Sequence, residues 1–109
     1  MIIISFENQV LHDSCVELER AEKLFGSVHA SALVTFLSDA WAFENACELI
    51  AFLDGGAKIG PDDSLTVAIG TEYHASLVPV GTQFARDSHG RVVWASVTRL
   101  KLTEISRLS

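Results

Sequence analysis

The chain has 109 residues, of which 49% are hydrophobic and 20% charged, and its formal net charge is −6. This length fits one domain over residues 1–109, and the hydrophobic content excludes a disordered chain. The charge is uneven: residues 1–54 hold nine acidic residues against two basic ones (−7), and residues 55–109 hold five against six (+1), so any nucleic-acid contact is expected from the second half.

The first half of the chain has the apolar spacing of helices. It opens with a β-branched run from Ile2 to Phe6, which predicts a strand. Asn8 is placed to cap a helix that ends at Gly26. A second helix begins at Ser27 and carries apolar residues three and four positions apart: Leu33, Phe36, Leu37, Ala40 and Trp41. A further helical segment is predicted over residues 43–53.

After Gly56 the apolar period changes from helical to two, which predicts strands. Strands are expected over residues 65–69 and 73–80, followed by a polar loop at 81–90. Residues 92–94 and 97–105 are expected to form the last strand, or two strands with a bend between them. In the last strand Leu100 and Leu102 point to one side, and Arg99 and Lys101 point to the other. The order of elements predicts an α+β fold: an antiparallel or mixed sheet of about four to five strands, with the N-terminal helices packed on one side.

The remaining composition signals concern cysteine, tryptophan and the membrane. Cys15 and Cys47 form no CxxC motif, and their apolar neighbours favour buried thiols in a reducing compartment. The histidines have no ligand-like spacing, so neither a metal nor another cofactor is predicted. No segment fits a bilayer span or a secretion signal, and we expect a soluble, cytoplasmic protein. Trp41 and Trp94 occupy apolar positions and are predicted to lie in the core.

A longer pattern runs through nearly the whole chain. It starts with Ile4, Ser5, Phe6, Asn8, Leu11 and Cys15. Through the helices it continues with Ala21, Leu24, Gly26, Val28, Ala30, Leu33, Leu37, Ala42, Glu44 and Leu49. Its most specific part is the end: Tyr73, Pro79, Trp94, Val97, Thr98, Glu104 and Ile105. In this order and spacing the chain resembles the RelE/HigB-like toxins of bacterial toxin–antitoxin pairs, and within them the HigB-like killer-protein branch.

The resemblance implies a small α+β toxin that binds a cognate antitoxin, enters the ribosome and cuts mRNA there. In that reaction a 2′-hydroxyl attacks the adjacent phosphate, cations stabilise the developing charge, and nearby groups move the protons without a metal. Carried over to this chain, the resemblance implies catalytic roles for His74, Lys101 and Lys58. Three of the four arginines of the second half are candidates for RNA binding: Arg99, Arg86 and Arg91.

The chain also departs from the family pattern. The family generally has an arginine where this chain has His74, and its usual Tyr and His after the last strand have no counterpart here. Histidine is a weaker phosphate clamp than arginine. On residue type alone His74 is a sheet-surface histidine, and Lys58, Arg99 and Lys101 are solvated cations unless they converge.

Two functions therefore stay open. One is a toxin that cleaves mRNA, or a weakened descendant of such a toxin. The other is a non-catalytic relative that binds an antitoxin-like partner or itself. A cluster of the basic residues on one concave sheet face would favour the first function. An exposed apolar groove without such a cluster would favour the second.

Overall fold

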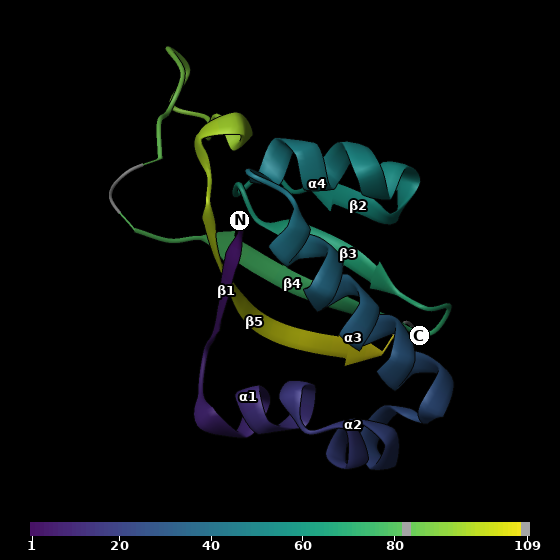
Figure 1. Cartoon of the computed structure of the whole chain (residues 1–109). Coiled ribbons are helices and arrows are strands. Elements are labelled where there is room, and N and C mark those ends of the chain that lie inside the picture. The colour runs from purple at the N-terminus through teal and green to yellow at the C-terminus, as the bar shows by residue number, and fades with distance from the viewer. Residues whose placement is uncertain (82–83, 108–109) are drawn as a thin grey trace.

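A computed structural model describes residues 1–81 and 84–107 (Figure 1). The elements follow in the order β1 (Ile3–Phe6), α1 (Gln9–Val16), α2 (Leu18–Phe25), α3 (Ser27–Ala42), α4 (Ala46–Leu53), β2 (Ala57–Ile59), β3 (Leu65–Ile69), β4 (Tyr73–Pro79) and β5 (Arg99–Arg107). Short 3₁₀ turns at Asp54–Gly56 and Trp94–Ser96 precede β2 and β5. The prediction of an α+β fold with N-terminal helices is confirmed.

The strands of the described residues form one mixed sheet in the order β1-β5-β4-β3-β2. β1 pairs parallel to β5, and the other neighbours pair antiparallel. β5 is the second strand in this order and is therefore bonded on both sides, to β1 and to β4. A register shift between Ser76 and Leu77 marks a β-bulge where β4 meets β5. The bulge changes which residues of β5 share a face with those of β4.

The helices cover one face of the sheet, with α3 lying across it in Figure 1. On β3 and β4 the buried residues alternate with more exposed ones, as a sheet with one covered face requires. The core residues of the strands that pack under the helices are Leu65, Val67, Ile69, Ala75, Leu77, Leu100 and Leu102. Within residues 1–81 and 84–107, none of the helices combines the length and apolar character that crossing a membrane demands.

Local side-chain bonds explain where the helices begin. The backbone N–H of Leu11 donates to the Asn8 side chain at 2.8 Å, and the N–H of Glu48 donates to the Asn45 side chain at 3.0 Å. The single helix predicted between Asn8 and Gly26 is wrong, because Glu17 has extended backbone angles (φ −94°, ψ 105°) and divides it into α1 and α2. This break allows both short helices to place a small side chain in the core.

Three smaller predictions are also wrong. Residues 92–94 form no strand; Val92 makes an isolated bridge to Arg86, and the chain then turns, with the Ser96 hydroxyl donating to the Val93 carbonyl at 2.6 Å. Trp41 is 59% exposed, since it lies on the side of α3 that faces away from the sheet. Cys47 is exposed, whereas Cys15 is buried as predicted. Trp94 is partly buried against the core.

Gly70, in the turn between β3 and β4, gives a first stability prediction. Its φ of +65° is a conformation that L-residues rarely adopt, and an added Cβ would lie 2.5 Å from Cδ2 of His29. Gly70→Ala should therefore lower the free energy of unfolding by about 2 to 3 kcal/mol in urea titrations. Gly55→Ala is the matched control, because nothing lies within 4 Å of its added Cβ. Equal losses in the two variants would contradict the assigned contact.

The two thiols should differ in reactivity. Burial raises the pKa of the Cys15 thiol to about 11, so roughly 0.1% of it is ionised at pH 8, whereas Cys47 is exposed. With a thiol-specific disulfide reagent at pH 8, we expect one thiol to react rapidly and the second to react only after unfolding in guanidinium. Cys47→Ser should remove the rapid phase. Two rapid thiols in the native wild-type protein would show that the Cys15 site opens readily.

Candidate functional site

The uncovered face of the sheet carries most of the side chains that the sequence singled out. Alternation along β5 places Arg99 and Lys101 on this face, because Leu100 and Leu102 point into the core. His74 lies on the same face of β4, since its neighbour Ala75 is buried. Lys58 on β2 is exposed there and pairs with Thr66 of β3. The sheet thus brings these four residues to one surface.

They share a face but do not meet at a point. Lys101 pairs with Val78, which lies four residues along β4 from His74, or about 13 Å at the usual rise per strand residue. Lys58 is separated from β5 by the two intervening strands β3 and β4, or about 14 Å. Among the residues implicated in catalysis, no two make a hydrogen bond in the described part of the chain. A stretch of RNA with more than one phosphate would have to bridge them, or the side chains would have to reorient.

Two carboxylates also belong to this surface, and the sequence did not single them out as site residues. The Nζ of Lys101 lies 2.9 Å from a carboxylate oxygen of Glu7, just beyond β1. Glu104 pairs with Ser76 across the bulge and accepts a hydrogen bond from the Ser106 hydroxyl. Because 35% of the Lys101 side chain and 46% of the Glu7 side chain are exposed, this ion pair is weak and can open.

His74 is half-buried between its strand neighbours Ala68 and Ser106. Its Nδ1 is enclosed and has no hydrogen-bond partner within residues 1–81 and 84–107. The other ring nitrogen, Nε2, is not among the enclosed, unpartnered side-chain atoms of the described residues. Nε2 is therefore the atom through which His74 can accept or donate a proton at the surface.

Arg86 and Arg91 lie elsewhere, on the segment between β4 and β5. Nε of Arg91 donates to Asp63 at 2.8 Å, and Nη1 of Arg86 lies 3.5 Å from the other oxygen of the same carboxylate. Arg86 also donates to the Gly90 carbonyl at 2.9 Å. Asp63 is only 15% exposed and lies in the turn before β3. These bonds attach the segment to that turn, and the two arginines do not join the basic residues of the sheet face.

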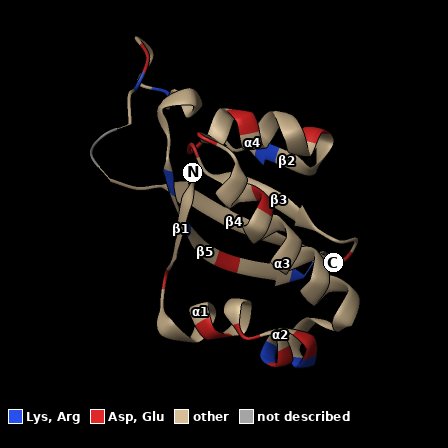
Figure 2. Ribbon diagram, viewed as in Figure 1, with Lys and Arg blue, Asp and Glu red and all other residues tan. Residues whose placement is uncertain are grey.

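The charge of the molecule is segregated. Acidic residues recur on α1, α2, α3 and α4, where the cations are limited to α2 (Figure 2). On the opposite face of the sheet the charged side chains are Lys58, Arg99, Lys101 and Glu104, with Glu7 at the edge. The open face is consequently the surface on which a phosphate backbone meets the least repulsion.

Comparison with family models, with curated proteins and with solved structures finds no match. The assignment of the candidate site is therefore based on the positions of its residues alone. No three His, Cys, Asp or Glu side chains gather as a metal site would require anywhere in residues 1–81 and 84–107.

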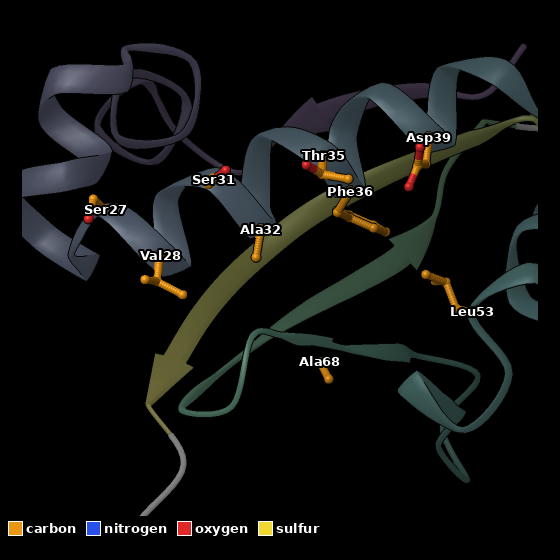
Figure 3. Close-up of a pocket in the computed structure, with 9 residues that line it drawn as sticks. All are labelled: Ser27, Val28, Ser31, Ala32, Thr35, Phe36, Asp39, Leu53 and Ala68. Carbon is orange, nitrogen blue, oxygen red and sulfur yellow. The ribbon is translucent and has the colours of Figure 1, made fainter.

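Two grooves on the helical side are the other hollowed surfaces of interest. The first, of about 570 Å³, lies between α3 and the edge of β3 (Figure 3). Residues spaced by four along α3 give it a polar rim: Ser27, Ser31, Thr35 and Asp39. The second, of about 410 Å³, lies between α1 and α3 and is almost entirely apolar. Sequence periodicity did not reveal either groove, because each depends on how two elements pack.

Proposed function

We propose that this chain is the toxin component of a type II toxin–antitoxin pair of the RelE/HigB-like kind, and that it acts on RNA through the open face of its sheet. The observation that carries the proposal is the shared face of Lys58, His74, Arg99 and Lys101, on the side away from the acidic helices. Cytoplasmic mRNA on the ribosome is the proposed substrate, and a cognate antitoxin is the proposed partner.

In the proposed reaction the roles follow from side-chain chemistry. Arg99 and Lys101 hold the phosphates on either side of the scissile bond, and Lys58 stabilises charge at the reacting phosphate. The 2′-hydroxyl oxygen bonds to phosphorus while the bond to the 5′-oxygen breaks, which leaves a cyclic phosphate and a 5′-hydroxyl. Nε2 of His74 takes or supplies a proton in this exchange. Lys101 must leave Glu7 before it can bind a phosphate.

A second candidate function is favoured by a different observation. Lys58, His74 and Lys101 do not converge, and an exposed apolar groove lies between α1 and α3. A protein that retains the fold for binding alone, without cleavage, fits these two features. The two candidates differ in whether mRNA is cut.

Primer extension on mRNA bound to translating ribosomes tests the proposal. The wild-type protein should produce new 3′ ends within codons, and His74→Ala should reduce the cleavage rate by about 10² or more, the usual effect of losing a general acid–base. His89→Ala is the matched control, because His89 is exposed on the distant segment between β4 and β5. Intact mRNA at high concentrations of the wild-type protein would contradict the nuclease function and would favour the function in binding alone. Equal cleavage by wild type and His74→Ala would remove His74 from the site.

A further inference from the structure

The groove between α1 and α3 is an unpartnered apolar surface on the side of the molecule away from the open sheet face. Its lining consists of Cys15 and Val16 from α1 and of Val34, Leu37, Ser38 and Trp41 from α3. Cys15 is fully buried, while Trp41, Val16 and Val34 are 59%, 51% and 39% exposed. No charged residue is among those that line the groove. Its rims therefore hold large side chains that are hydrated in the isolated chain.

Trp41 is the side chain that calls for an explanation. The buried residues of α3, Leu33, Phe36 and Ala40, already fix this helix to the core, so stability does not require an aromatic residue at position 41. Exposed apolar surfaces commonly mark interaction sites, and tryptophan is enriched among the residues that contribute most to binding. Its large ring gains the most when a partner covers it.

The shape of the groove favours a helix as its occupant. Both walls are helices, whose backbone N–H and C=O groups are bonded within each helix. A bound strand would find no backbone partners there and would leave its own polar groups unpaired over an apolar surface. A helix satisfies its own backbone, and its side-chain ridges can pack between those of α1 and α3.

Charge distinguishes among possible helices. The groove is built from residues 1–54, whose formal charge is −7, and Figure 2 shows acidic positions on α1, α2, α3 and α4. Glu44 lies three residues beyond Trp41, whereas Glu17, which follows Val16, is paired with Arg20 at 2.8 Å. A second copy of this chain would bring two acidic helical layers together. A helix with basic residues beside its apolar stripe would instead be attracted.

We propose that the groove between α1 and α3 binds an amphipathic helix of a partner protein, whose apolar stripe covers Trp41, Val34 and Val16 and whose flanks are basic. This goes beyond the proposed action on RNA, because the two surfaces lie on opposite sides of the sheet. It does not depend on that action, and binding and cleavage are measured separately. The groove beside β3 is a poorer site for such a helix because its rim is polar.

The test uses the full chain and two synthetic peptides of about 18 residues, or five helical turns. One peptide has a leucine stripe flanked by lysines, and the other has the same stripe flanked by glutamates. Binding of labelled peptide is followed by fluorescence anisotropy. We expect the lysine peptide to bind the wild-type protein and the glutamate peptide not to bind.

Two variants on one helix distinguish the groove from general attraction to an acidic surface. Val34 lines the proposed groove, and Val28 lines the other groove; both are exposed valines of α3. Val34→Lys should weaken binding of the lysine peptide at least about tenfold, whereas Val28→Lys should leave the affinity within about twofold. Trp41→Ala, which leaves the charge unchanged, should also weaken binding at least about tenfold and replaces Val34→Lys if that variant unfolds.

Four outcomes would overturn the inference: no binding of the lysine peptide, equal binding of the two peptides, equal weakening by Val34→Lys and Val28→Lys, or unchanged binding by Trp41→Ala. Self-association in analytical ultracentrifugation that Trp41→Ala abolishes would assign the groove to a second copy of this chain instead. Urea unfolding of each variant verifies that the binding measurement is made on folded protein.

Discussion

Leu102→Ala should lower the free energy of unfolding by about 3 to 4 kcal/mol, within the usual range for a leucine truncated in a core. Leu102 is 0% exposed on β5, the strand that pairs with β1 on one side and β4 on the other. It is opposite Phe6 in β1 and Leu77 in β4, so the lost volume lies where three strands meet and cannot be filled easily. The free energy of unfolding of a whole domain is only about 5 to 15 kcal/mol, so this loss is a large part of it.

Urea titration followed by far-UV circular dichroism measures this loss. Leu24→Ala is the matched control, since Leu24 is 55% exposed on α2 and its truncation should cost about 0.5 kcal/mol or less. The slope of unfolding free energy against urea should be the same for both variants and the wild type. A Leu102→Ala loss below about 1 kcal/mol would mean that β5 is not the centre of the core.

The strands that follow the helices could be predicted because their side chains obey a single constraint. One face of β3 and the start of β5 are buried, so apolar and polar residues alternate, as Val67 and Leu100 illustrate. The segment 92–94 has the same β-branched composition but lacks a second strand to pair with. Composition measures suitability for a sheet, whereas pairing depends on distant parts of the chain.

The helices were predictable where a cap or an apolar stripe marked them, and less so where packing decided. Asn45 caps α4, which begins at Ala46. The apolar pattern alone predicted a helical segment that begins at residue 43, because it did not identify Asn45 as the cap. The break at Glu17 has no glycine or proline to signal it. Trp41 was assigned to the core because it continues an apolar spacing, but α3 has a second apolar side that faces the groove with α1. Periodicity indicates which residues are apolar on a helix, and not which of two apolar sides is covered.

The candidate site was predictable as a face and not as a cluster. Alternation alone places Arg99 and Lys101 on the surface opposite the core. The spread of Lys58 and His74 over that surface depends on the order of the strands in the sheet, which side-chain alternation does not define. The carboxylate of Glu104 comes to the face through the bulge, which adds one residue to β5 relative to β4. A strict two-residue period would have assigned Glu104 to the other side.

Binding of RNA to the open face of the sheet can be tested apart from cleavage, through the salt dependence of the affinity. If RNA lies on this face, Arg99→Ala/Lys101→Ala should flatten the dependence of log affinity on log salt by about 1.4, because each lost contact to a single-strand phosphate removes about 0.7. Filter binding of a labelled single-stranded RNA over a range of salt concentrations measures this slope. At moderate salt the affinity should fall at least about tenfold.

The control removes the same charge from the other side of the molecule. Arg20→Ala/Lys23→Ala takes two cations from α2, one of them paired with Glu17 at 2.8 Å much as Lys101 is paired with Glu7 at 2.9 Å. Equal slopes for the two double variants would mean that only net charge matters and that the sheet face is not the RNA surface.

A substitution that should raise RNA affinity is a further test of the sheet face as the RNA surface. Glu7→Gln frees Lys101 and removes a carboxylate that repels phosphate, so RNA affinity should rise above the wild-type value by about threefold or more. A general effect of lower stability could not produce such a rise. If Glu7→Gln instead weakens binding, the assignment of Lys101 as a phosphate contact released from Glu7 is wrong.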